Sequence, residues 1–217
     1  MDTMIFDMDG TLIDTEKYYN RCWVRAITEA GFEITPEEAL DLRSLGRPFA
    51  PRYFREKFGE AFDYRKIRAR RKELMEEMIA EEGISLKPGV RELLAVLREK
   101  GIRPMIATAT DMERTQRYLG QLGIRDAFDR VISAVMVEKG KPAPDVYLYA
   151  CRAAERKPQE CIAVEDSPNG VRSAAAAGCR VIMVPDLSEP DEELSRLIER
   201  RADSLYSVCS WVKENRL

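Results

Sequence analysis

The sequence predicts an α/β fold, in which a parallel sheet carries helices on both faces and a helical segment is inserted after the first strand. Two observations predict this fold. After residue 86, short runs rich in Val and Ile alternate with amphipathic helical segments, as in sheets whose strands are buried on both faces. Residues 16–82, by contrast, are helical and rich in charge, without a strand signal. We therefore expect a core domain of residues 1–14 and 86–217 and a helical cap domain of residues 15–85.

The individual elements follow from periodicity and from helix-end signals. We expect strands over residues 4–8, 104–108, 131–132, 161–164 and 181–184. We expect helices over residues 16–30, 53–58, 64–82, 90–100, 111–123, 145–155, 169–177, 192–200 and 205–215, with a capping box at residues 35–38. The two connections between the parts, residues 11–16 and 85–88, are natural hinges. In a Rossmann-like sheet of this kind, the working site lies at the carboxyl ends of the strands.

Composition restricts the class of partner. The 217 residues carry a net charge of −3 with both signs mixed along the chain, so no basic surface for nucleic acid is expected. No window approaches the roughly 20 apolar residues that cross a membrane, and no secretion signal precedes the first strand. The cysteines are scattered and form no CxxC pair, which is typical of reduced thiols. We expect a cytoplasmic monomer that binds neither nucleic acid nor a membrane.

The sequence contains no histidine. This absence excludes a histidine general base, a phosphohistidine intermediate, a Ser-His-Asp triad and histidine-ligated metal sites. Any acid–base chemistry must come from Asp, Glu, Lys, Tyr or Cys. A site built from carboxylates binds a hard cation through oxygen, which favours Mg²⁺.

The first predicted strand ends in the sequence DMDGT, residues 7–11. Asp7 and Asp9 flank one methionine, and two carboxylates this close repel each other unless a cation or a reaction uses them. An ordinary Asp-Gly turn is the alternative interpretation. The chain behind this turn becomes helical instead of returning as a second strand, which disfavours a hairpin.

Three further strand ends carry polar side chains. Thr108 ends an apolar strand just before a helix N-terminus, where free N–H groups bind phosphate, although an ordinary helix cap also explains it. Lys141 lies in the stiff loop GKPAP, where a lysine either neutralises phosphate and carboxylates or lies in solvent. Glu165 and Asp166 follow a buried strand, and Ser167 behind them also fits a plain N-cap.

In combination, DMDGT, the hydroxyl at a strand end, GKPAPD and VEDS resemble the motifs of the haloacid dehalogenase-like superfamily. The resemblance covers nearly the whole chain, including the helical cap, and is nearest to the subgroup of β-phosphoglucomutase and small sugar-phosphate phosphatases. It implies that Asp7 is a nucleophile that forms an aspartyl-phosphate and that Asp9 is the general acid and base. It also implies that Thr108, Ala109 and Lys141 bind the phosphoryl group, with Lys141 holding Asp7 beside it.

The same resemblance implies a bound Mg²⁺ ion. Its ligands would be Asp7, the backbone carbonyl of Asp9, Asp166 and Glu165, the last directly or through water. Such an ion offsets the repulsion between these acids and the phosphate of a substrate. The presence of Asp9 disfavours a dehalogenase, because those members of the superfamily generally lack an acid at this position.

The cap is expected to set specificity. Arg47 and Lys72 align with cations that hold the distal phosphate in β-phosphoglucomutase, although both also fit a solvated helix surface. Tyr19 replaces a histidine of that enzyme and is a poor proton carrier near neutral pH, unless it simply packs inside the cap. We expect a magnesium-dependent phosphatase that acts on a small phosphate ester such as a sugar phosphate. A β-phosphoglucomutase-like phosphomutase is the alternative, and a non-catalytic binding protein is a third.

Overall fold

A six-stranded parallel sheet forms the centre of the computed structural model, which describes residues 2–217. The strands are β1 Thr3–Phe6, β2 Arg103–Thr108, β3 Arg130–Ser133, β4 Cys161–Glu165, β5 Arg180–Met183 and β6 Arg200–Arg201, in the order β3-β2-β1-β4-β5-β6. In the register, Thr3 of β1 lies opposite Arg103 of β2 and Cys161 of β4. The predicted α/β fold is confirmed, with the first strand in the middle of the sheet.

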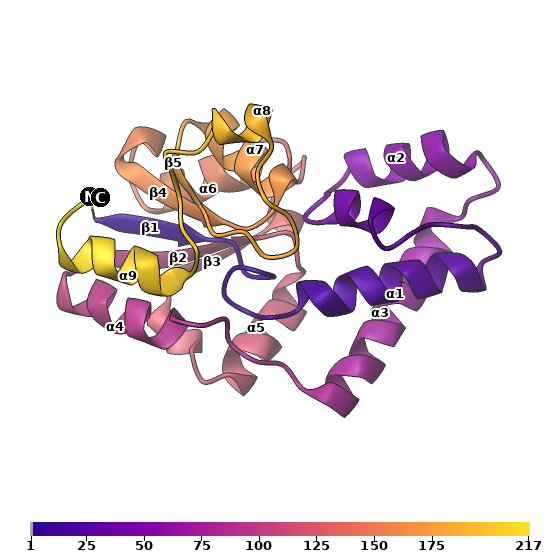
Figure 1. The fold of residues 1–217 in the computed structure, drawn as a ribbon, viewed down its shortest axis with the longest axis horizontal. Coiled ribbons are helices and arrows are strands. Elements are labelled where there is room, and N and C mark those ends of the chain that lie inside the picture. The colour runs from indigo at the N-terminus through magenta and orange to yellow at the C-terminus, as the bar shows by residue number, and fades with distance from the viewer. Residues whose placement is uncertain (1) are drawn as a thin grey trace.

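Helices cover both faces of this sheet. They are α4 Val90–Glu99, α5 Met112–Gln121, α6 Asp145–Ala153, α7 Pro168–Ala177, α8 Glu192–Ser195 and α9 Leu205–Lys213. Figure 1 shows α4, α5 and α9 on one face and α6, α7 and α8 on the other. Because successive strand residues point to opposite faces, Met4 and Phe6 pack in one apolar core and Ile5 in the other.

The stretch between β1 and α4 is helical. It contains α1 Glu16–Glu29, the 3₁₀ helix η1 Glu38–Leu42, α2 Phe49–Phe58 and α3 Tyr64–Glu82, which together we call the helical segment. Figure 1 shows these helices grouped beyond one end of the sheet. They share aromatic packing of their own, with the rings of Phe54 and Phe62 stacked 4.7 Å apart and Trp23 5.0 Å from Phe54. This arrangement fits the cap domain of residues 15–85, whose boundaries stay a prediction.

The two predicted hinges lie side by side. The N–H of Asp14 donates to the carbonyl of Ser85 at 2.9 Å, and the N–H of Lys87 donates to the carbonyl of Leu12 at 2.9 Å. The chain therefore leaves the sheet and returns to it through one paired connection. Two adjacent connections of this kind are where a hinge motion of the helical segment is expected, and that motion stays a prediction.

Several elements differ from the sequence prediction, and helix α2, for example, begins at Phe49 instead of residue 53. Helix α8 ends at Ser195 instead of continuing to residue 200, and the chain then forms the two-residue strand β6 beside β5. Two arginines carry no apolar strand signal, so pairing with β5 decides their conformation. The capping box is present, with reciprocal hydrogen bonds between Thr35 and Glu38, but it opens only the short helix η1.

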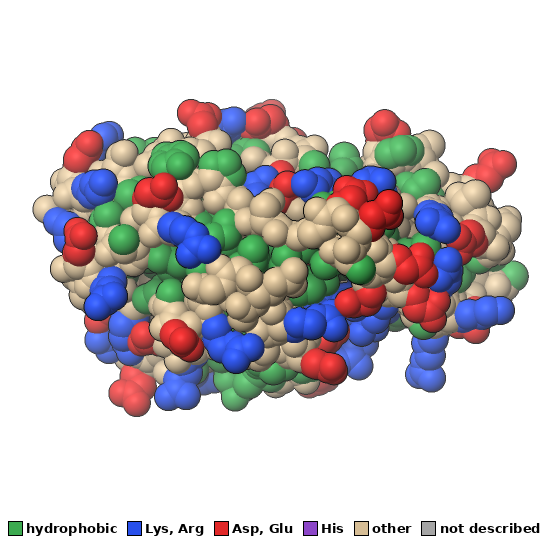
Figure 2. Space-filling model, turned by 90° about the horizontal axis from the view of Figure 1, so that it is seen from below, with side chains coloured by type: hydrophobic (Ala, Val, Ile, Leu, Met, Phe, Trp, Pro, Cys, Tyr) green, Lys and Arg blue, Asp and Glu red, His purple; other side chains and the backbone are tan. Residues whose placement is uncertain are grey.

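The surface carries both signs of charge. On the face drawn in Figure 2, basic and acidic side chains are interspersed, as the net charge of −3 leads one to expect. Within residues 2–217, no helix combines the length and the apolar character that a bilayer crossing requires. The absence of a nucleic-acid partner stays a prediction.

Candidate active site

Polar side chains from three adjacent strands meet at the carboxyl edge of the sheet. Asp7 follows β1, Thr108 ends β2, and Glu165 ends β4 with Asp166 directly behind it. All four residues are at most 1% exposed. Parallel strands present their carboxyl ends at one edge, which is why residues far apart in the sequence form a single site.

Lys141 lies among these acids. Its Nζ donates to Asp7 Oδ1 at 2.5 Å and to Glu165 Oε1 at 2.6 Å, and the hydroxyl of Tyr147 donates to the same Glu165 oxygen at 2.5 Å. Burial lowers the pKa of a lysine, but the carboxylates of Asp7 and Glu165 outweigh it and raise the pKa of Lys141 above its ordinary value. Lys141 is therefore a charged, buried partner of the acids and does not lie in solvent.

The acidic group fits a divalent cation. Asp7, Glu165 and Asp166 each offer an oxygen, and these atoms lie within 4.8 Å of one another. Asp7 Oδ2 and Asp166 Oδ2 are buried without a hydrogen-bond partner in residues 2–217, which costs free energy until a cation or a donor reaches them. Gly10 makes this approach possible, because its φ is +86° and a Cβ there would lie 2.4 Å from Asp166 Oδ2. Hard oxygen ligands of this type suit Mg²⁺.

Glu165 differs from the other two acids. Its Oε1 already accepts hydrogen bonds from Lys141 and Tyr147, so it holds Lys141 in place. Burial raises the pKa of Glu165 to about 7. Burial, together with Asp7 and Glu165, raises the pKa of Asp166 well above its ordinary value. The unpartnered oxygens of Asp7 and Asp166 are thus the better placed ligands among the described residues.

Asp9 is held by two threonine hydroxyls. Thr15 Oγ1 donates to Asp9 Oδ1 at 2.6 Å, and Thr110 Oγ1 donates to Asp9 Oδ2 at 2.7 Å. Burial, and then the charge of Asp7, raise the pKa of Asp9 to about 6. A carboxyl group with a pKa near neutrality can both release and accept a proton, which suits a general acid and base.

The loop after β2 is fixed around Thr108. The N–H of Thr110 donates to Thr108 Oγ1 at 3.0 Å, which leaves the Thr108 proton available for another acceptor. Ser133 Oγ donates to the carbonyl of Thr110 at 2.6 Å and anchors the same loop from β3. Ala109 lines the cavity described next. With Lys141, described above, the structure therefore brings all three predicted phosphate-binding residues to the site.

A cavity of about 900 Å³ opens over these residues, with walls from the sheet edge and from the helical segment. The predicted residues Tyr19, Arg47 and Lys72 all line it. Sequence reasoning missed four further charged residues that line it and that are nevertheless buried: Glu16, Arg43, Arg71 and Arg114. A single charged residue in a polar stretch carries no sequence signal for burial, so these positions look like ordinary surface.

Arg43 and Glu16 bring further charge close to the acids. Arg43 Nη1 lies 3.8 Å from Asp166 Oδ2, and the side-chain amide of Asn169 donates to the Arg43 carbonyl at 2.9 Å. Glu16 is 3% exposed, and its Oε2 has no partner among the described residues. Burial, and then the charge of Asp166, raise the pKa of Glu16 well above its ordinary value. Residues of the helical segment thus contact the same site as the strand ends.

The cap cations are not equivalent. Lys72 Nζ lies 3.1 Å from Asp111 Oδ2, so its charge is already paired. Arg71, the preceding residue, is 6% exposed, and its Nε and Nη1 have no hydrogen-bond partner in residues 2–217. Its guanidinium lies over the rings of Tyr19 and Trp23, at 4.8 and 5.0 Å from their centroids. Arg71 is therefore better placed than Lys72 to meet an anion in the cavity.

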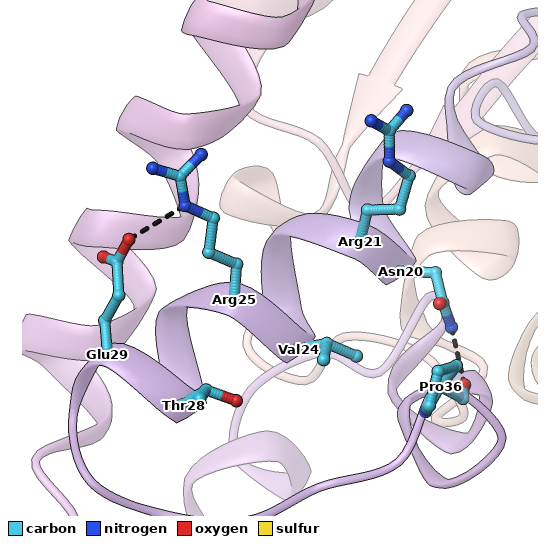
Figure 3. A pocket seen from close by; sticks show the side chains of 7 residues that line it. All are labelled: Asn20, Arg21, Val24, Arg25, Thr28, Glu29 and Pro36. Carbon is cyan, nitrogen blue, oxygen red and sulfur yellow. Dashed lines mark hydrogen bonds and ion pairs between the residues drawn. The ribbon is translucent and has the colours of Figure 1, made fainter.

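A second hollow lies along α1, away from the acids (Figure 3). Arg25 lines it and pairs with Glu29 at 2.9 Å, and the amide of Asn20 donates to the carbonyl of Pro36 at 2.8 Å. None of the predicted site residues lines this hollow. The chemistry is therefore expected in the cavity at the sheet edge.

Comparison with known proteins agrees with this geometry. The family model of haloacid dehalogenase-like hydrolases matches residues 1–178. The chain is 30% identical to the protein CbbY of Cereibacter sphaeroides over 94% of both chains, and 33% identical to hexitol phosphatase B of Escherichia coli K12 over 95% of this chain and 93% of that protein. The crystal structure of CbbY from Rhodobacter sphaeroides in complex with phosphate superposes with a TM-score of 0.79 at 29% identity, covering 96% of each chain.

A likeness in fold extends further. A putative β-phosphoglucomutase from Bacteroides vulgatus has a TM-score of 0.82 at 24% identity, covering 98% of this chain and 88% of that chain. The resemblance predicted from the motifs is confirmed, and with it the prediction of an enzyme of the phosphatase type. The chain belongs to the haloacid dehalogenase-like hydrolase family, as the match over residues 1–178 shows and as the strand-end acids and the buried lysine lead one to expect.

Proposed function

We propose that the protein is a magnesium-dependent phosphatase that hydrolyses a small phosphorylated metabolite, specifically a sugar phosphate, through an aspartyl-phosphate on Asp7. One observation carries the proposal. Asp7 has one oxygen held by Lys141 at 2.5 Å, while the other is buried and without a partner among the described residues. The first contact fixes the carboxylate, and the second oxygen is available for the metal. The names of two relatives, hexitol phosphatases A and B, support a sugar-type substrate.

The reaction follows from the positions of Asp7 and Asp9. A carboxylate oxygen of Asp7 attacks phosphorus, the bond to the ester oxygen breaks, and the carboxylic acid of Asp9 gives that oxygen its proton. Asp9 then removes a proton from water, which attacks the phosphorus of the aspartyl-phosphate. The bond to Asp7 breaks, phosphate leaves, and both the Asp7 carboxylate and the protonated Asp9 are restored. A pKa of about 6 allows Asp9 to serve in both directions.

Lys141 and the Mg²⁺ ion would both offset negative charge during this reaction. Lys141 remains protonated between Asp7 and Glu165 and offsets negative charge on the transferring group. Asp7, Asp166 and the backbone carbonyl of Asp9 would hold the Mg²⁺ ion, with Glu165 contributing directly or through water. When bound, this ion neutralises phosphate oxygens and orients the phosphate for in-line attack.

The cavity favours a substrate with more than one anionic or polar group. Within residues 2–217, Arg47, Arg65, Arg68 and Arg71 line it without an ion-pair partner. An arginine fork binds phosphate or carboxylate oxygens in pairs, so these residues suit the far end of a phosphorylated sugar or sugar acid. The same arginines also suit the second phosphate of a bisphosphate, which is the observation that keeps a phosphomutase as the second candidate.

A screen of phosphorylated metabolites tests the proposal. Purified protein is incubated with each compound and Mg²⁺, and release of inorganic phosphate is measured. We expect turnover of at least one sugar phosphate, loss of activity with a chelator, and loss of activity in Asp7→Asn. The exposed residue Asp126 gives a matched control, and Asp126→Asn should keep full activity. No phosphate release from any compound contradicts a phosphatase, and magnesium binding without turnover would favour a binding protein.

The phosphomutase alternative has its own readout. β-Glucose 1-phosphate is incubated with a trace of the bisphosphate primer, and glucose 6-phosphate is measured beside inorganic phosphate. Formation of glucose 6-phosphate faster than phosphate supports a mutase. Phosphate release without isomer formation supports the phosphatase.

A further inference from the structure

A chain of hydroxyl groups runs from the helical segment to Asp9. Tyr19, on α1, places its hydroxyl 3.1 Å from Thr110 Oγ1, and Thr110 Oγ1 lies 2.7 Å from Asp9 Oδ2. Thr110 is 8% exposed and Asp9 is 6% exposed, so both side chains are largely shielded from water. The predicted roles of the strand-end residues leave Thr110 without a function.

The direction of this chain follows from counting protons. Once Asp9 has given up its proton, its carboxylate only accepts hydrogen bonds, so in this state the single hydroxyl proton of Thr110 points to Asp9 Oδ2. The Thr110 oxygen must then accept from Tyr19, whose phenol must carry its proton. Burial, and then the charge of Asp9, raise the pKa of Tyr19, so the phenol stays protonated. The order of donation is therefore Tyr19 to Thr110 to Asp9.

The residues at both ends of this series of hydrogen bonds, Tyr19 and Asp9, are held in place. Arg71 of α3 lies over the Tyr19 ring at 4.8 Å and holds its orientation. At the other end, Thr15 Oγ1 donates to Asp9 Oδ1 at 2.6 Å, so each carboxylate oxygen has one hydroxyl donor. With one donor per oxygen, the plane of the Asp9 carboxylate is set. The N–H and carbonyl of Thr110 have partners of their own in Thr108 and Ser133, so the threonine side chain is free to act on Asp9.

We propose that Thr110, oriented by Tyr19, is a positioning residue that holds Asp9 in the orientation needed to transfer a proton to the leaving oxygen and from the attacking water. This inference rests on the role of Asp9 in the proposed function. Thr110 touches neither the attacking nor the leaving oxygen in that mechanism. Because proton transfer depends on the orientation of the carboxyl group, loss of the hydroxyl slows the chemical steps and leaves substrate binding almost unchanged.

The test compares threonine variants that differ by one group. Thr110→Val keeps the shape and removes the hydroxyl, whereas Thr110→Ser keeps the hydroxyl and removes a methyl group. The matched control is Thr115→Val, because Thr115 is buried like Thr110, and its hydroxyl donates to the Asp111 carbonyl instead of to Asp9. With p-nitrophenyl phosphate and Mg²⁺, we expect Thr110→Val to lower kcat about tenfold or more. KM should fall in parallel, because slow hydrolysis lets the aspartyl-phosphate accumulate, so kcat/KM should stay within about twofold of the wild-type value. Thr110→Ser should restore most of kcat, and Thr115→Val should keep it.

A rapid-mixing experiment measures the burst of p-nitrophenol, which would stay unchanged if Thr110 only stabilised the fold. p-Nitrophenolate leaves without needing much protonation, so Thr110→Val should still phosphorylate Asp7 but should activate water slowly. We expect a burst of about one equivalent of p-nitrophenol, followed by slow turnover. Tyr19→Phe removes the donor to Thr110 and should lower kcat about two- to tenfold, as loss of one hydrogen bond does. This variant tests the chain from its other end if Thr110→Val unfolds at a lower temperature.

The outcomes separate two failures. A wild-type protein that hydrolyses neither p-nitrophenyl phosphate nor any compound of the metabolite screen contradicts the proposed function, and the proposed role of Thr110 is then wrong as well. An active wild-type protein whose Thr110→Val and Tyr19→Phe variants keep its kcat overturns the positioning role alone. Equal losses in Thr110→Val, Thr110→Ser and Thr115→Val would also overturn it, because they would indicate general damage to packing.

Discussion

Gly46 and Gly140 meet backbone to backbone. A Cβ on Gly46 would lie 2.6 Å from the Cα of Gly140, and the contact is framed by two hydrogen bonds. The N–H of Gly46 donates to the Lys141 carbonyl at 2.8 Å, and the N–H of Gly140 donates to the Arg47 carbonyl at 2.7 Å. The helical segment therefore docks on the loop that carries Lys141, at a contact that leaves no room for a side chain.

Gly140→Ala should disturb this docking. An added Cβ would lie 2.9 Å from the Cα of Gly46, so the loop bearing Arg47 must move away from the site. We expect kcat/KM to fall about tenfold, mainly through KM, measured with a sugar phosphate. Gly120→Ala is the matched control, because an added Cβ there meets only the movable end of the Arg125 side chain. Equal kinetics of Gly140→Ala and Gly120→Ala would contradict the docking role.

Lys141→Met should remove activity and stability together. The substitution leaves Asp7 and Glu165 as neighbouring buried carboxylates without a cation, which typically costs about 3–5 kcal/mol of unfolding free energy. We also expect kcat to fall about 100-fold or more, because Lys141 would no longer offset charge on the transferring group.

A double variant separates the two effects of Lys141. Adding Glu165→Gln to Lys141→Met removes one stranded charge, so stability in urea should partly return while kcat stays low. Lys139→Met, in the same loop but exposed, is the control for both measurements and should resemble the wild type. If Lys141→Met unfolds at the wild-type urea concentration, the buried ion pairs do not stabilise the fold.

Mg²⁺ should stabilise the folded protein through Asp7 and Asp166. Their two unpartnered oxygens gain a ligand, so thermal unfolding monitored by circular dichroism should shift to higher Tm as Mg²⁺ is added. Asp166→Asn should abolish most of this shift, whereas Asp126→Asn should keep it. An unchanged shift in Asp166→Asn would place the cation elsewhere.

Stability without divalent cations should fall as the pH rises from about 4 to about 7. In the folded state burial raises the pKa of Asp9 from 3.8 to about 6 and that of Glu165 from 4.5 to about 7. The folded state therefore binds these protons more tightly than the unfolded state, so this contribution is complete below the unfolded pKa and is lost as the pH passes through 6 and 7.

Urea unfolding in a chelator at pH 5 and pH 7.5 measures this loss. Asp9→Asn should reduce the difference between the two pH values, because an amide does not titrate. If wild type and Asp9→Asn lose the same free energy between pH 5 and 7.5, Asp9 keeps an ordinary pKa in the folded protein.

Arg71 and Lys72 should differ in their effect on substrate binding. Arg71→Met should raise KM for esters that carry a second anionic group, by about tenfold, and should change KM for p-nitrophenyl phosphate little. Lys72→Met should leave both KM values within about twofold, because Lys72 is already paired with Asp111. The opposite pattern would return the anion-binding role to Lys72.

The strand-end residues were predictable from the sequence for one physical reason. Each of them lies at the end of a short apolar run, and parallel strands bring such ends to one edge of the sheet. Asp7, Thr108 and Asp166 therefore lie close together regardless of the conformation of the loops. Lys141 carried a weaker signal, since its loop could also have placed it in solvent. Only the packed structure shows it buried between two acids.

The cavity walls were harder to predict. Successive residues on an α-helix point about 100° apart, so Arg71 and Lys72 face different surroundings although their sequence signals are the same. Glu16 and Arg43 are charged residues in helical, polar stretches, where a sequence pattern predicts exposure. Their burial depends on how the helical segment packs on the sheet, and a local sequence pattern carries no information about that packing. The strand β6 was missed for a related reason, because pairing with β5 alone makes it a strand.

The central position of β1 has a consequence for the order of folding. This strand precedes its neighbours β2 and β4 by a long stretch of chain, because they begin only at Arg103 and Cys161. Contacts between residues so far apart in the chain are slow to form, because loop closure must precede them. During synthesis, β1 therefore stays unpaired until β2 and β4 have been made. Asp7 can form its ion pair with Lys141 only after that lysine has been made. The nucleophile therefore leaves the ribosome well before Lys141, Glu165 and Asp166, the residues that complete its site.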